Sequence, residues 1–127
     1  METADPQRQI KLGTRASPLA LCQSEKVAQA LVAAQGWSEA AIELEKIITK
    51  GDTHLDRKLA EIGGKGLFTE ELEAGLRDGS LDIAVHSLKD LPTVSPQGLT
   101  LGAILPREDA RDVLVPRAGL AFQSLED

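Results

Sequence analysis

The sequence predicts an α/β domain in which helices flank a mostly parallel β-sheet. Residues 83–85 are a short apolar run of the kind that a buried parallel strand shows. The chain then becomes polar abruptly, at His86, Ser87, Lys89 and Asp90. Because parallel sheets bind ligands outside the carboxyl ends of their strands, a Lys-Asp pair at this point favours a ligand site. A solvated turn before Pro92 is the other interpretation of the same residues.

The composition is that of one ordinary domain with a hydrophobic core. The chain has 127 residues, of which 42% are hydrophobic. Its net charge of -6 argues against a nucleic-acid partner, because nucleic-acid-binding domains usually carry clustered positive charge. The 2% aromatic content also leaves few rings on which bases could stack. An anionic ligand would therefore need a local basic site.

The cysteine and histidine counts predict a cytoplasmic protein that binds no metal. Cys22 is the single cysteine of the chain, so it cannot form an intrachain disulfide. One cysteine and two histidines do not make a spaced set of metal ligands. Residues 1–9 are polar, and no run approaches the roughly 18 apolar residues of a membrane span. We therefore expect no membrane partner.

Residues 10–14 predict the first strand, and a helix is expected to follow it. Ser17 suits the N-cap and Pro18 the first helical position, where its missing N–H costs nothing. Gly36 suits the position just past the helix end. The expected apolar face consists of Leu19, Val27, Ala30, Leu31 and Ala34. Arg15 is thereby placed at a helix N-terminus, which favours a carboxylate site, although an ordinary capped helix with a surface arginine explains the same pattern.

Residues 42–49 alternate between apolar and polar side chains, which predicts a second strand with one partly exposed face. A short helix is expected over residues 56–62 and a longer one over residues 67–77. Between them, a glycine-rich loop carries Lys65, but its spacing is neither that of a dinucleotide site nor that of a P-loop. Phe68 either packs in the core or lines a cleft.

The last third of the chain predicts one more strand and then a change of domain. Residues 93–98 form a connector with proline and glycine, and residues 99–105 are expected to be a strand. The polar residues 106–112 resemble a hinge. We expect a flexible segment at 1–9, a first domain at 10–105, and a hinge with the incomplete start of a second domain at 106–127.

Three stretches together resemble the porphobilinogen deaminases, also called hydroxymethylbilane synthases. They are residues 13–21 (GTRASPLAL), 63–72 (GGKGLFTEEL) and 86–92 (HSLKDLP), and the resemblance runs from about Ile10 to Val115. It implies the first domain of a three-domain enzyme, with a type II periplasmic-binding-protein-like fold. Family members join four porphobilinogen units head to tail in tetrapyrrole biosynthesis, with loss of ammonia. They do so on a dipyrromethane cofactor that is attached to a cysteine of the third domain.

The resemblance also assigns roles to individual residues. It implies that Asp90 is the catalytic carboxylate, which stabilises the positive charge that develops when ammonia departs. The residues implied to bind substrate are Arg15, Ser17, Gln23, Lys65 and Lys89. Those implied to contact the cofactor are Ser87, Lys89 and Asp90. The implied partners are porphobilinogen, the growing polypyrrole and the remaining two domains.

Two departures from the family pattern change what the resemblance implies. Glu61 stands where family members commonly have a lysine, which removes or reverses one basic contact. Cys22 does not match the cofactor cysteine, and a buried, inert thiol is the expected role for it. Since no residue of this chain matches the attachment cysteine, we expect an incomplete enzyme that is inactive alone. The alternative is a truncated, non-catalytic module of the same fold that binds anions.

Overall fold

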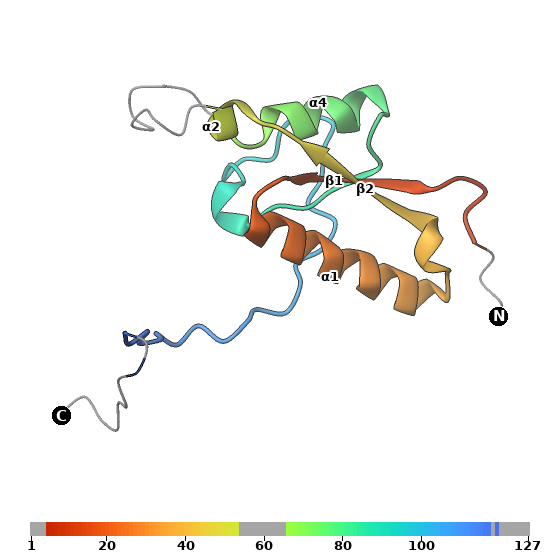
Figure 1. Ribbon diagram of the computed structural model, residues 1–127. Helices are drawn as coiled ribbons and strands as arrows, with labels where there is room; N and C mark the ends of the chain where they lie inside the picture. Colours follow the sequence, from red (N-terminus) through yellow and green to blue (C-terminus); the bar gives the residue numbers. More distant parts are fainter. Residues whose placement is uncertain (1–4, 54–65, 118, 120–127) are drawn as a thin grey trace.

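The computed structural model describes residues 5–53, 66–117 and 119, and it contains a three-stranded parallel sheet. The strands are β1 (Ile10–Arg15), β2 (Ile42–Ile47) and β3 (Ile83–Ala84), in the order β2-β1-β3. Leu12 pairs with Leu44 on one side and with Ile83 on the other. Figure 1 shows helix α1 on one side of this sheet and helix α4 on the other. The predicted α/β class with a parallel sheet is confirmed.

Helix α1 (Pro18–Gln35) begins and ends where the sequence predicts. The backbone N–H of Ala20 donates to the Ser17 hydroxyl oxygen at 3.3 Å, which satisfies one of the free amides of the first turn. Gly36 adopts a left-handed conformation with φ 66°, and its N–H donates to the Val32 carbonyl. These two caps fix the helix between β1 and the 3-10 turn η1 (Glu39–Ala41), which precedes β2.

The predicted apolar face of α1 is wrong in part. Leu19 is 58% exposed, and Ala30 and Ala34 are also exposed, whereas Ser24 is the buried residue of the helix. The buried and half-buried residues recur along almost the whole helix, at positions 20, 24, 27, 31 and 35. The covered stripe of α1 is therefore rotated away from Leu19, Ala30 and Ala34 and centred on Ser24, Val27 and Leu31.

The core lies between the central strand and α4 (Glu70–Asp78). Leu12 and Leu72 are fully buried, and Leu81 is 5% exposed. A β-carbon added at Gly13 would lie 2.5 Å from the Leu81 side chain, and one added at Gly75 would lie 2.8 Å from it. Leu81 thus occupies the space that these two glycines leave, and this contact joins α4 to β1.

Two predicted elements have different bounds in the structure. The second strand was predicted at residues 42–49 but ends at Ile47. The short helix α2 (Lys50–Thr53) follows it. The helix expected from residue 67 begins only at Glu70, because residues 66–69 form a turn with Thr69 as the N-cap. The expected helix at 56–62, including Glu61, and the loop residue Lys65 lie outside the described residues.

The strand expected at residues 99–105 is absent, and this prediction is wrong. These residues have no regular secondary structure, and Leu101, Ile104 and Leu105 are 51%, 68% and 44% exposed. A strand needs a neighbour for its backbone hydrogen bonds, and in the described part of the chain this segment pairs with none of the three strands. Figure 1 shows the segment leading away from the sheet and its helices.

Candidate functional site

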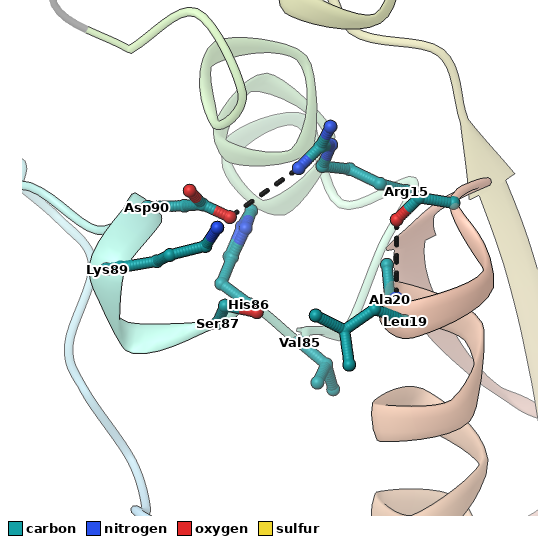
Figure 2. Close-up of a pocket in the computed structure, with 9 residues that line it drawn as sticks. Arg15, Leu19, Ala20, Val85, His86, Ser87, Lys89 and Asp90 are labelled. Atoms are coloured by element: carbon teal, nitrogen blue, oxygen red, sulfur yellow. Dashed lines mark hydrogen bonds and ion pairs between the residues drawn. The ribbon is translucent and has the colours of Figure 1, made fainter. Parts of the chain in front are cut away.

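A cavity of about 120 Å³ lies at the carboxyl ends of β1 and β3. Because both strands are parallel and adjacent, the residues that follow them meet at the same edge of the sheet. The 3-10 turn η2 (Leu88–Asp90) follows β3 and supplies part of the wall. The lining residues are Arg15, Ser17, Leu19, Ala20, Val85, His86, Ser87, Lys89 and Asp90 (Figure 2). Five of the predicted site residues are therefore brought together: Arg15, Ser17, Ser87, Lys89 and Asp90.

Arg15, the last residue of β1, makes the central contacts of this site. Its Nη2 lies 2.5 Å from Oδ1 of Asp52, and its Nε lies 3.2 and 3.3 Å from the two carboxylate oxygens. Its Nη1 lies 3.5 Å from Oδ2 of Asp90, an ion pair that Figure 2 marks with a dashed line. The guanidinium carbon also lies 4.1 Å from the ring centre of Phe68, a cation–π distance.

The three charged side chains are largely removed from water. Arg15 is 17% exposed, Asp52 22% and Asp90 16%. The hydrogen bond from Arg15 lowers the pKa of Asp52, with further help from Thr49 and against the effect of burial. The hydrogen bond to Asp52 in turn raises the pKa of Arg15. One arginine therefore lies between two carboxylates, of which Asp90 lines the cavity and Asp52 lies behind its wall.

Gln23 and Ser87 form a second link across the site. The Ser87 hydroxyl donates to Oε1 of Gln23 at 2.9 Å, which connects the turn after β3 to helix α1. Gln23 is not among the cavity-lining residues, and its contact with substrate stays a prediction. Lys89 is exposed at the cavity wall, where its ammonium group can reach an anion.

Two further residues of this region, Asp52 and His86, have no role predicted from the sequence. Asp52 follows β2 at the same edge of the sheet, and that position was the signal that could have identified it. His86 lines the cavity, and its Nδ1 is buried without a hydrogen-bond partner among the described residues. Burial lowers the pKa of His86, Arg15 lowers it further, and Asp90 and Glu73 oppose this shift. Phe68, for which core and cleft were both considered, is half-buried beneath Arg15.

The expected burial of Cys22 is wrong, because the thiol is exposed on α1 and does not line the cavity. Across residues 5–53, 66–117 and 119, no three His, Cys, Asp or Glu side chains are arranged to bind a metal ion. Within these same ranges, no helix combines the length and the apolar character that crossing a bilayer requires.

The fold and the cavity define an α/β domain with a paired cation and carboxylate at the ligand-binding edge of its sheet. Residues 10–127 match the family model described as "Porphobilinogen deaminase, dipyromethane cofactor binding domain". The match covers nearly the whole chain, so the chain belongs to the porphobilinogen deaminase family.

Two curated relatives agree with this assignment. The chain is 48% identical over 126 residues to the porphobilinogen deaminase of Sphingopyxis alaskensis, which covers 99% of this chain and 40% of the relative. It is 50% identical over 121 residues to the porphobilinogen deaminase of Paracoccus denitrificans, which covers 95% of this chain and 39% of the relative. The chain thus spans about two fifths of the length of these relatives.

Proposed function

We propose that the chain forms the first domain of a cytoplasmic hydroxymethylbilane synthase, with a type II periplasmic-binding-protein-like fold. The complete enzyme would join four porphobilinogen units into hydroxymethylbilane and release ammonia, whereas the 127 residues alone would be inactive. The observation that carries this proposal is the Arg15–Asp90 pair, 3.5 Å apart at the carboxyl edge of the sheet. Family membership and the neighbouring Ser87 and Lys89 support it.

Arg15 and Lys89 are proposed to bind the carboxylates of the substrate. Every pyrrole of porphobilinogen and of the growing chain carries an acetate and a propionate, so binding needs guanidinium or ammonium partners. Each charge-assisted hydrogen bond of this kind contributes about 1.5–3 kcal/mol. Ser17 offers a hydroxyl at the same wall, and Lys65, outside the described residues, remains a third proposed cation. A protein of net charge -6 must concentrate such groups locally.

Asp90 is proposed to be the catalytic carboxylate. Its side chain is 16% exposed, so a charge on it is only weakly screened by water. At the cavity wall it can accept hydrogen bonds from pyrrole N–H groups and stabilise the cation that forms as ammonia leaves. Its contact with Arg15 is long for a hydrogen bond, which leaves the carboxylate able to face a ligand.

The donor set of the cavity fits the dipyrromethane cofactor. Ser87, Lys89 and Asp90 offer a hydroxyl, an ammonium and a carboxylate, which match the carboxylates and N–H groups of two linked pyrroles. When bound, dipyrromethane supplies the pyrrole end to which new units are joined. Cys22 is unsuited to its covalent attachment, because the thiol lies outside the cavity. We propose that the attachment cysteine belongs to another domain of the enzyme.

The test uses an active full-length enzyme that carries this sequence. Asp90→Asn should preserve the fold but slow single-turnover ammonia release by on the order of 10² or more, as for the loss of a preorganised charge. Asp90→Glu should retain part of the rate, because the charge survives while its position shifts.

The matched control is Asp82→Asn, which removes another carboxylate that pairs with an arginine, at a position outside the cavity. It should release ammonia at nearly the wild-type rate. If Asp90→Asn also keeps the wild-type rate with its cofactor loaded, Asp90 is a turn residue before Pro92. The non-catalytic anion-binding module would then be the better description of this domain.

A further inference from the structure

The contacts of Arg15 point to a role for Asp52, a residue that lies outside the cavity lining. We infer that Asp52 is a positioning residue that holds the Arg15 guanidinium by one edge and so prevents it from closing on Asp90. This inference rests on the proposed function of Asp90. Asp52 would affect the reactivity of Asp90 only through the position of Arg15.

The Arg15 guanidinium contacts three neighbours, each at a different part of the group. Asp52 accepts hydrogen bonds from Nε and from Nη2, so one whole edge of the planar group is occupied. Phe68 lies against the face of the group, 4.1 Å from its central carbon. The Nη1 end is directed at Asp90, at 3.5 Å. Asp52 and Phe68 thus set the orientation of the guanidinium, and its remaining end faces Asp90.

The two ion pairs of Arg15 differ in length. The Asp52 contact at 2.5 Å is a direct hydrogen bond, whereas the Asp90 contact is longer than the about 2.7–2.9 Å of a charge-assisted bond. Arg15 is close enough to attract Asp90 but does not donate a well-formed hydrogen bond to it. Asp90 therefore keeps oxygen atoms that a ligand N–H or cation can use.

Asp52 is itself held in place by hydrogen bonds with Thr49. Its Oδ2 accepts hydrogen bonds from the Thr49 hydroxyl at 2.7 Å and from the Thr49 backbone N–H at 3.2 Å. The Asp52 backbone N–H donates back to the Thr49 carbonyl at 3.0 Å. Thr49 is 1% exposed, so these bonds are shielded from water. Asp52 can resist movement of Arg15 because its own carboxylate is anchored by buried Thr49, which lies between β2 and α2.

Loss of the Asp52 charge should therefore change the Arg15–Asp90 contact. An asparagine cannot accept from both Nε and Nη2 and also from Thr49, since one oxygen has become an NH₂ donor. The guanidinium is then drawn to the remaining carboxylate, Asp90, and forms a direct hydrogen-bonded pair with it. A crystal structure of Asp52→Asn in the full-length enzyme should show this shorter contact, whereas Asp82→Asn should leave the distance unchanged.

The kinetic test uses the same active full-length enzyme, with porphobilinogen as the substrate. Asp52→Asn should lower kcat by on the order of tenfold to a hundredfold, because the charge of Asp90 is diverted to Arg15. Asp52→Glu should restore part of the rate. In an Arg15→Gln background, where Asp52 has nothing to hold, adding Asp52→Asn should change the single-turnover rate by less than about twofold.

Asp82→Asn again provides the control, since Asp82 is 25% exposed and Asp52 22%, and each pairs with an arginine. The inference is overturned if Asp52→Asn behaves like Asp82→Asn, or if its loss is fully additive with that of Arg15→Gln. Failure of the proposed function has a different signature, because Asp90→Asn would then keep the wild-type rate. That result would contradict both the proposed role of Asp90 and the inference about Asp52.

Discussion

The contacts of residue 15, at the end of β1, require the planar guanidinium of an arginine. The Arg15 guanidinium meets a carboxylate along one edge, an aromatic ring on one face and a second carboxylate at its free end. A lysine has a single compact ammonium and could satisfy one of these contacts well but not all three. Arg15→Lys would therefore keep the charge and lose the arrangement that separates Asp52 from Asp90.

The hydrogen bond between Arg15 and Asp52 also predicts a pH dependence of stability. The pKa of Asp52 is lower in the folded protein than its usual value of about 3.9. The stabilisation that follows is complete above this usual value and is lost as the pH falls through the lower, folded value. The free energy of unfolding of wild type should exceed that of Asp52→Asn by a constant amount from neutral pH down to about pH 4. The difference should shrink in more acidic solution.

Urea denaturation at a series of pH values measures this difference. A gap that stays constant at every pH at which both proteins fold would contradict the role of the Asp52 charge. Asp78→Asn is a useful comparison, because hydrogen bonds from Ser80 lower the pKa of Asp78 at a fully exposed site. Its effect should be smaller, since water competes for the same carboxylate.

Sequence reasoning identified the residues of the site that follow recognisable strands. The polar switch after residues 83–85 pointed to Ser87, Lys89 and Asp90, and the capped helix pointed to Arg15 and Ser17. Asp52 was missed because its place after β2 marks the right edge of the sheet, but its partner Arg15, 37 residues away in the chain, is set by the fold. The exposure of Cys22 was likewise mispredicted, because Cys22 lies two residues before the buried Ser24 and so on the opposite face of α1.

At the scale of elements, α2 and the turn before α4 are joined through a glycine. The Gly51 N–H donates to the Leu67 carbonyl at 2.8 Å. A β-carbon on Gly51 would lie 2.2 Å from the Phe68 ring, a distance that atoms do not tolerate. Gly51 is therefore required for space, and the ring that uses this space also supports Arg15.

Gly51→Ala should consequently destabilise the protein by about 1–3 kcal/mol, as overpacking does, and displace Phe68 from Arg15. Urea denaturation measures the first effect, and the NMR signal of the Arg15 Nε–H group reports the second. Gly102→Ala is the matched control, because its added β-carbon would meet nothing within 4 Å. Equal stability of the two alanine variants would show that Phe68 moves without cost.

Elements with strong end signals were predictable, and those that depend on distant partners were not. The caps at Ser17 and Gly36 fix α1 locally, so its bounds followed from the sequence. Residues 99–105 have a strand-like composition, but a strand also needs an edge to pair with. The start of α4 at Glu70 was displaced from residue 67 because Gly66, at φ 85°, begins a turn.

At the scale of the whole molecule, residues 101–115 carry two exposed apolar stretches, one on each side of the polar residues 106–112. The exposed side chains are Leu101, Ile104, Leu105, Val113, Leu114 and Val115, and their exposed fractions range from 44% to 85%. Large exposed apolar patches favour association between proteins. We expect the 127-residue chain to self-associate in a concentration-dependent way through this segment.

Sedimentation velocity at increasing concentration tests this expectation. Ile104→Lys together with Val113→Lys should raise the concentration needed for association by about tenfold or more, which corresponds to about 1.4 kcal/mol. Val94→Lys serves as the control, because Val94 is 78% exposed but lies outside the segment from 101 to 115. A wild-type chain that stays monomeric at all accessible concentrations would contradict the expectation.

The strand order β2-β1-β3 has a consequence for the nascent protein. β1 precedes β2 and β3 in the chain, so it leaves the ribosome before them, yet it occupies the middle of the described sheet. Both of its neighbours are parallel, so each must arrive through a crossover and neither can form a hairpin with it. The contact between Arg15 and Asp52, 37 residues apart in the chain, therefore needs only β1 and β2 to pair, whereas the contact with Asp90 also needs β3. The two ion pairs of Arg15 thus depend on different numbers of assembled strands.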